Sequence, residues 1–220
     1  MEAKVLGKPS FGRIEVTLEP TESIIAESDA MANMAGDLDM TARFNGGFFS
    51  GLSKKFLGKE SLFVNEFTNN KSRPRQLVLT SNLPGDIREH RLEGGGICMQ
   101  PGAYIASTPD VKLGVQWAGF SSWIGREGLL RLEAKGNGSV WYGAYGGMLE
   151  KEIDGEYIVD TGHLVAYDPQ IKLKAQLAGG LISSLLGGEG LVTRLEGHGT
   201  AIIQTRTLSG LASWLNPKLR

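Results

Sequence analysis

The feature that most constrains the fold of this 220-residue chain is an internal repeat. Residues 102–119 (GAYIASTPDVKLGVQWAG) and residues 162–179 (GHLVAYDPQIKLKAQLAG) align at an offset of 60, with eight of eighteen positions identical. The match resumes where residues 127–129 and residues 189–191 both read EGL. Chance gives about one identity in eighteen at ordinary composition. The repeat therefore predicts copies of one structural unit.

A fainter third copy lies upstream. Residues 23–26 (SIIA) match the strand-like start of the second copy, and residues 58–62 (GKESL) match the GREGL string that ends at residue 129. The chain then divides into three units of about 73 residues, with boundaries near 1–75, 76–147 and 148–220. Units of this size bury too little surface to be stable alone. We expect them to share a core or to pack side by side in a single body.

Each unit has the pattern of β-structure. Polar and apolar residues alternate in residues 13–18 (RIEVTL), 172–177 (KLKAQL) and 200–205 (TAIIQT). Period two is typical of strands with one buried and one solvated face. The sequence therefore predicts an all-β fold of three pseudo-repeated small sandwich or barrel units. The one exception is residues 209–217, which predict one or two helical turns ending at Pro217.

We interpret the glycine clusters as turns that separate these strands. Glycine is 31 of 220 residues, and it gathers with Pro or Asn at residues 83–86, 94–96, 136–138 and 197–199. Such clusters are typical of turns, and glycine supplies the positive φ that turns need. The cluster at 94–96 lacks the following Lys and Ser or Thr of a phosphate-binding loop.

Composition and charge exclude several classes of protein. The net charge of −1 gives no global attraction to nucleic acid or to anionic membranes. No run approaches the roughly 20 apolar residues of a membrane-spanning helix. One cysteine forms no intrachain disulfide, and the N-terminus lacks the apolar stretch of a signal peptide. We expect a cytoplasmic protein, with peripheral contact to a membrane left open, and neither an enzyme nor a bound cofactor or metal.

The first candidate site is a set of apolar residues in three glycine-flanked segments. Each segment predicts a one- or two-turn amphipathic helix at the same place in its unit. In a ring these turns form a rim that meets a membrane surface or a protein partner. The alternative is that they cap the barrels or pack between units. The residues are Phe49, Leu52, Phe56, Phe120, Trp123, Ile124, Leu181, Ile182, Leu185 and Leu186.

The second candidate site is aromatic. Trp141, Tyr142 and Tyr145 lie within five residues of each other and predict a small-ligand pocket at a unit boundary. The alternative is aromatic packing across strands.

The string Asp160-Thr161-Gly162 resembles the catalytic loop of aspartic proteases. That chemistry needs two carboxylates that share a proton, and the matching residues 99–102 (MQPG) contain no Asp. We interpret the string as a turn between strands.

Other reactive side chains predict no chemistry. His90, His163 and His198 have no zinc spacing, although the last two share the third unit and could meet across strands. Cys98 lies in an apolar strand and is expected to be a small buried hydrophobe.

A basic cluster of Lys71, Arg73 and Arg75 occurs in one unit alone. A periodic RNA track needs the same charge in every unit, so we expect no nucleic-acid partner.

Several glycine-anchored strings resemble a known family. Residues 23–27 (SIIAE), 58–63 (GKESLF), 160–166 (DTGHLVA) and 187–191 (GGEGL) are similar to the uncharacterised bacterial family related to the mitochondrial-biogenesis (altered inheritance of mitochondria) proteins. The resemblance covers nearly the whole chain. It implies three units per chain, each a shortened double-stranded β-helix like the subunit of the tryptophan RNA-binding attenuation protein. It also implies a homotrimer in which nine units close a ring.

The resemblance implies little about activity. The mitochondrial relatives are linked to inner-membrane organisation, and the bacterial relatives have no assigned activity. A ring is physically reasonable, because edge-to-edge association removes free sheet edges and closed symmetry prevents a filament. We expect a non-enzymatic ring scaffold whose partners are its own copies and a protein or membrane surface. The alternative is a small-molecule-responsive ring with ligand sites between units.

Overall fold

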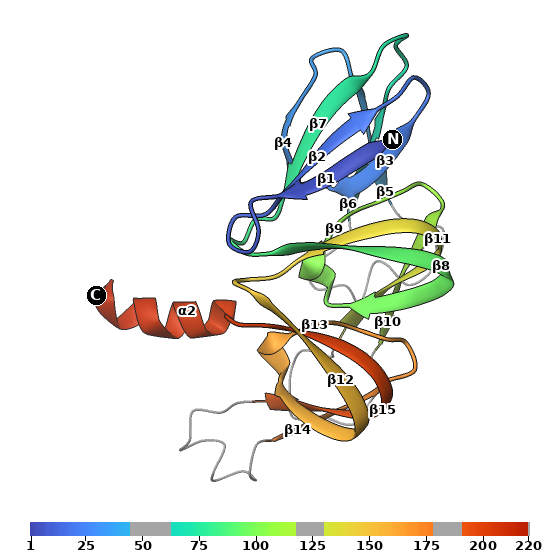
Figure 1. Cartoon of the computed structure of the whole chain (residues 1–220). Helices are drawn as coiled ribbons and strands as arrows, with labels where there is room; N and C mark the ends of the chain where they lie inside the picture. The colour runs from blue at the N-terminus through green and yellow to red at the C-terminus, as the bar shows by residue number, and fades with distance from the viewer. Residues whose placement is uncertain (45–62, 118–129, 178–190, 220) are drawn as a thin grey trace.

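The computed structural model describes residues 1–44, 63–117, 130–177 and 191–219. Figure 1 shows three successive groups of strands in a row, with the group that contains β1 to β7 at one end and the group that contains β12 to β15 at the other. The strands are β1 (Glu2–Leu6), β2 (Arg13–Leu18), β3 (Ser23–Glu27), β4 (Met31–Met34), β5 (Asp39–Phe44), β6 (Phe63–Thr68), β7 (Arg75–Thr80), β8 (Ile87–Met99), β9 (Tyr104–Ser107), β10 (Val111–Trp117), β11 (Leu130–Gly143), β12 (Met148–Asp160), β13 (Leu164–Tyr167), β14 (Lys172–Leu177) and β15 (Leu191–Gln204).

The strands form two sheets, and every described strand pair is antiparallel. A four-stranded sheet has the order β1-β2-β7-β4. An eleven-stranded sheet has the order β12-β15-β13-β8-β11-β9-β3-β6-β5, with β10 beside β11 and β14 beside β15. The all-β prediction is confirmed.

Local sequence explains the elements. In β2 the side chains of Ile14, Val16 and Leu18 are buried while their neighbours face outward, as the alternation predicts. The predicted strand over residues 172–177 is β14, with the same bounds.

The described residues also form three short helical elements, η1 (Pro101–Ala103), η2 (Thr161–His163) and η3 (Asn216–Lys218), beside helix α2 (Leu208–Leu215). The predicted C-terminal helical turns are therefore confirmed, since α2 runs directly into η3. The Thr207 hydroxyl caps α2 by accepting a 3.0 Å hydrogen bond from the Gly210 amide.

Three of the glycine clusters do not end strands, so that prediction is wrong for them. Residues 94–96 lie inside β8, residues 136–138 inside β11 and residues 197–199 inside β15. The positive φ expected of glycine is present, for example +131° at Gly138, where a Cβ would lie 2.0 Å from Thr108 Oγ1. The pairing of β11 with β8 shifts register at these glycines. Glycine thus lets a long strand bulge and bend without ending.

The second and third groups of strands have the same order of elements. The series β8, η1, β9, β10, β11 is followed by β12, η2, β13, β14, β15. In each series the first and last strands pair along their length, from Ile87↔Gly143 to Met99↔Leu132 in one and from Met148↔Gln204 to Asp160↔Val192 in the other. The division into three units with boundaries near residues 75 and 147 stays a prediction.

Adjacent groups share their cores. Trp141 and Ile105 of the second group are buried among residues of the first, and Cys98 of the second is buried among residues of the third. Strand pairs also cross between groups, with Ala26↔Ala106 joining β3 to β9 and Tyr167↔Cys98 joining β13 to β8. Sharing apolar surface in this way suits units too small to be stable alone.

Candidate functional site

The predicted apolar rim lies outside the described residues. Its glycine-flanked segments, 48–57, 120–124 and 181–186, fall between the described ranges, so the rim stays a prediction.

The three candidate pocket aromatics are not brought to one surface. Trp141 and Tyr142 are successive residues of β11, so their side chains lie on opposite faces, and both are buried in separate core clusters. Burial raises the pKa of Tyr142 to about 12. These two placements match the alternative interpretation, packing across strands. Tyr145 follows β11 in a loop and lines a cleft.

The cleft at Tyr145 lies at the base of α2, between the second and third groups of strands. Its volume is about 280 Å³, which is at the lower end of small-ligand sites. None of the lining residues that the structure describes carries a charge. Its walls include Gln100, Gly102, Tyr145, Gly162, Gln204 and Thr207.

Two glutamines hold the walls of this cleft. The Gln204 side chain accepts a hydrogen bond from the Tyr145 amide and donates one to the Gly162 carbonyl, both at 2.8 Å. The Gln100 amide donates to the Thr161 carbonyl at 2.9 Å. These bonds tie the loop after β11 to the turn before β13. The arrangement offers an uncharged concave surface for a small ligand and no acid, base or nucleophile.

Asp160 has a structural role in a turn. Its Oδ1 accepts a 2.8 Å hydrogen bond from the Gly162 amide and caps η2.

The histidines do not meet. His163 Nδ1 lies 2.6 Å from the Gln204 carbonyl oxygen, whereas His198 Nδ1 lies 2.7 Å from Asp154 Oδ1. Residues 198 and 204 are six residues apart on β15, which corresponds to about 20 Å. Among the described residues, no group of three or more His, Cys, Asp or Glu side chains is placed to hold a metal ion.

Cys98 is fully buried, as predicted, opposite Tyr167 of β13. Burial raises the pKa of its thiol, which therefore stays protonated and unreactive at neutral pH.

The basic cluster is partly compensated. The Arg75 guanidinium donates two 2.6 Å hydrogen bonds to the Asp37 carboxylate and holds the pKa of that carboxyl below its ordinary value. The loop is held by the buried Asn69 side chain, which donates to the Leu18 and Arg73 carbonyls. Arg75 therefore adds little to any surface for a polyanion.

Sequence reasoning missed a surface at the end of β12. The offset of 60 aligns Ile97 with Tyr157 and Cys98 with Ile158. Ile97 and Cys98 are at most 3% exposed because β13 covers the end of β8. Tyr157 is 38% exposed and Ile158 is 53% exposed, and among the described strands β12 pairs with β15 alone. Extending the comparison of the two repeats five residues further upstream, to residues 97 and 157, could have revealed this surface from the sequence.

The end of β12 is suited to adding a strand. No described strand pairs with its second edge, and it carries apolar side chains where its counterpart is covered. Such an edge binds another β-strand through main-chain hydrogen bonds, and the exposed side chains give specificity.

The described helices include none with the length and apolar character that a membrane crossing requires.

Similar proteins agree with this architecture. A crystal structure of a Streptococcus pyogenes protein superposes with a TM-score of 0.79 and covers 99% of both chains at 22% identity, which shows a shared fold. An uncharacterised protein of Streptococcus pyogenes serotype M6 is 25% identical over 215 residues, covering 93% of this chain and 86% of the relative.

A family model matches most of the chain. The model described as mitochondrial biogenesis AIM24 aligns with residues 3–206, which include the described strands except the first residue of β1 and stop just before α2. The chain belongs to the mitochondrial biogenesis AIM24 family.

Proposed function

We propose that this protein is a non-enzymatic, ring-forming scaffold of the cytoplasm. Each chain contributes three units of the type found in the tryptophan RNA-binding attenuation protein, and a homotrimer closes nine units into a ring. The glycine-flanked turns form a rim that contacts a membrane surface or a protein partner. The observation that carries the assembly is the exposed end of β12.

Cys98 and Ile158 occupy equivalent positions in the second and third groups of strands. Cys98 is buried because the next group of strands lies over it through the Tyr167↔Cys98 pair. Ile158 stands at the equivalent position of the third group, and no described strand lies over it as β13 lies over Cys98. A strand from a second copy buries Ile158 as β13 buries Cys98.

The geometry favours head-to-tail association. The eleven-stranded sheet ends in β12 on one side and β5 on the other, so its two edge strands belong to the third and the first group of strands (Figure 1). A head-to-tail contact grows into a filament unless the rotation closes it. The family resemblance supplies the closure, because it implies three chains in a ring.

Charge supports the same contact. Strand β12 carries five acidic residues against one lysine, namely Glu150, Glu152, Asp154, Glu156 and Asp160. Two of them, Glu150 and Glu156, form ion pairs with Arg88 and Arg194. The loop between β6 and β7, in the first group of strands, carries Lys71 and Arg73. Opposite charges on the two ends of a molecule steer copies into head-to-tail register.

A closed ring gives a scaffold a way to act without catalysis. Equivalent weak contacts on one face of a closed assembly bind together, so their combined affinity exceeds that of each contact by orders of magnitude.

Native mass spectrometry of the purified protein tests this proposal. The chain weighs 23.7 kDa, so the trimer is expected at about 71 kDa. A monomer at micromolar concentration contradicts the scaffold.

A second candidate function is a small-molecule-responsive ring, and the cleft beside Tyr145 favours it. Its uncharged walls lie between two groups of strands, where a ligand would couple them. This function predicts a stoichiometric small-molecule adduct in the native mass spectrum, lost in Tyr145→Ala. A bare trimer favours the scaffold.

A further inference from the structure

Helix α2 (Leu208–Leu215) is an apolar appendage that belongs to none of the core clusters of the described residues. It projects sideways from the row of strands in Figure 1, and none of its residues is buried. The family match ends at residue 206, just before α2 begins. Its large exposed apolar side chains, continuing into η3, are Leu208, Leu211, Trp214, Leu215 and Leu219.

These side chains are arranged as an amphipathic helix. Leu208, Leu211 and Leu215 follow the i, i+3, i+7 spacing that places residues on one face. Ser209 and Ser213 lie on the other face. Helix α2 therefore has an apolar stripe that a monomer leaves in water.

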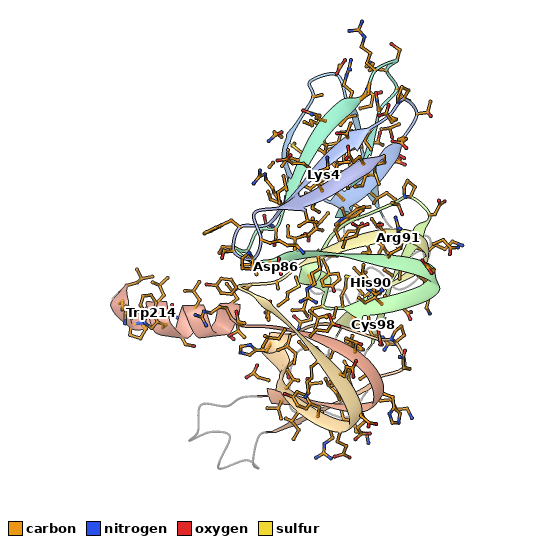
Figure 2. The ribbon with its side chains drawn as sticks, in the orientation of Figure 1. Lys4, Asp86, His90, Arg91, Cys98 and Trp214 are labelled. Atoms are coloured by element: carbon orange, nitrogen blue, oxygen red, sulfur yellow. The ribbon has the colours of Figure 1, made fainter. Side chains whose placement is uncertain are left out.

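Trp214 and Lys218 form an interfacial pair at the edge of that stripe. The Lys218 Nζ lies 4.6 Å from the centroid of the Trp214 ring. Figure 2 places Trp214 on the projecting helix, away from the sheets. Tryptophan and lysine prefer the boundary between the apolar layer and the headgroups of a bilayer, where an indole ring is half wet and an ammonium reaches the phosphates.

The charge of the segment identifies the class of lipid. Residues 206–219 include Arg206 and Lys218 and contain no acidic residue, although the whole chain carries a net charge of −1. A local basic segment on a nearly neutral protein is attracted to anionic headgroups.

We propose that α2 is an interfacial anchor that lies on the surface of anionic bilayers. This inference rests on the proposed scaffold function and names the segment and the lipid class for its membrane contact. Eight helical residues span about 12 Å, which is too short to cross a bilayer, so the helix lies in the interface plane.

Hydrogen bonds to the rest of the protein fix the position of the segment that leads into α2. The Thr205 amide donates to the Gly147 carbonyl and the Arg206 amide donates to the Tyr145 carbonyl, so the chain is held up to the residue before the Thr207 cap. A cyclic axis sets the three copies of α2 at one height, where they meet a single plane together. The three contacts then add, which matters because one short helix binds weakly.

Vesicle flotation with the full-length protein tests the anchor. The vesicles are phosphatidylcholine alone and phosphatidylcholine with 30% phosphatidylglycerol, a composition of roughly the charge density used to reveal electrostatic binding. The test variant is L211S/L215S, which alters exposed side chains of α2 alone. The matched control is Leu149→Ser, which removes an even more exposed leucine from β12. Native mass spectrometry gives the oligomeric state of each sample.

The anchor predicts flotation of the wild type and of Leu149→Ser with the anionic vesicles, and a bound fraction at least about tenfold lower for L211S/L215S. It also predicts weaker binding to neutral vesicles and in 0.5 M salt, roughly at the level where charges are screened within a few ångströms. Trp214→Phe is expected to lose the blue shift of tryptophan emission that accompanies binding.

Other outcomes overturn the anchor. A trimer that stays at the bottom with anionic vesicles overturns the inference and leaves the ring standing. Equal flotation of L211S/L215S and wild type also overturns it, because another surface then binds. If L211S/L215S loses the trimer, α2 docks on a second copy instead. A monomer that floats, with loss in L211S/L215S, supports the anchor and overturns the ring.

Discussion

The ends of β8 and β12 are the same piece of structure in two situations. Each is the last part of a 13-residue strand that pairs with a 14-residue partner and precedes a short 3₁₀ turn. Cys98 on β8 is fully buried, whereas Ile158 at the equivalent position of β12 is 53% exposed. The larger apolar residue is therefore the exposed one.

Burial at the end of the long strand therefore comes from the neighbouring unit. The sequence of each strand end is apolar, with ICM at residues 97–99 of β8 and YIV at residues 157–159 of β12. What differs is the presence of β13 over one of them. An apolar strand end that is repeated but left uncovered indicates a contact that completes itself in an assembly.

The largest expected effect is a loss of free energy of unfolding when the end of β8, which β13 covers, is altered. Met99→Ala removes a fully buried side chain that pairs with Ala166 of β13, so it should lower the free energy of unfolding by about 2–5 kcal/mol. Urea denaturation of dilute, monomeric protein measures this value. Ile158→Ala under the same conditions should cost less than about 1 kcal/mol, as expected of a surface position. Equal costs would remove the distinction between the two ends.

The next effect is on association. Ile158→Asp places a charge on the uncovered end, and we expect a loss of about 2 kcal/mol in association, or roughly thirtyfold in the binding constant. Analytical ultracentrifugation measures the shift toward monomer. The matched control is Leu149→Glu on the same strand, because the equivalent residue of β8 is already Glu89, at an end that no neighbouring group covers. An unchanged trimer in Ile158→Asp means that β12 is not the contact.

A smaller expected effect is the loss of stability at alkaline pH, which tests how completely water is excluded from the contact between β13 and β8. Burial raises the pKa of Tyr167, in the β13–β8 contact, and of Tyr142, in the adjacent core, to about 12. The unfolded chain loses these protons near pH 10, so the stability that the neutral phenols contribute is complete below about pH 10 and is lost as the pH rises through 12.

Alkaline urea titrations measure that loss. The slope is expected to approach about 1.4 kcal/mol per pH unit for each buried tyrosine. Tyr142→Phe should remove one such contribution. A slope that is the same in Tyr142→Phe contradicts the burial of its hydroxyl.

Much of the fold could be predicted from the sequence, because local patterns determine it. The alternation in residues 13–18 and 172–177 predicts β2 and β14, and the apolar spacing before Pro217 predicts α2. The glycine clusters were misinterpreted for a physical reason. Glycine permits both a turn and a bend within a strand, and only long-range pairing, such as Gly138↔Leu92, decides between them.

The sites were harder to predict, because they depend on contacts between distant segments. The cleft at Tyr145 needs Gln204, 59 residues away, to hold its wall. The exposure of Ile158 depends on which strand lies beside β12, and no local pattern records that. Trp141 and Tyr142 show the converse, since adjacent aromatics on a strand belong to opposite faces and so to different cores.

Thiol labelling of Ile158→Cys tests the central claim most directly, because the buried Cys98 serves as an internal reference in the same chain. We expect Cys98 to stay unlabelled in the folded protein. The thiol at position 158 should react fast in the dilute monomer and become protected as the protein concentration rises and the trimer forms. A thiol at position 158 that reacts at the same rate in monomer and trimer contradicts the proposal that a second copy covers the end of β12.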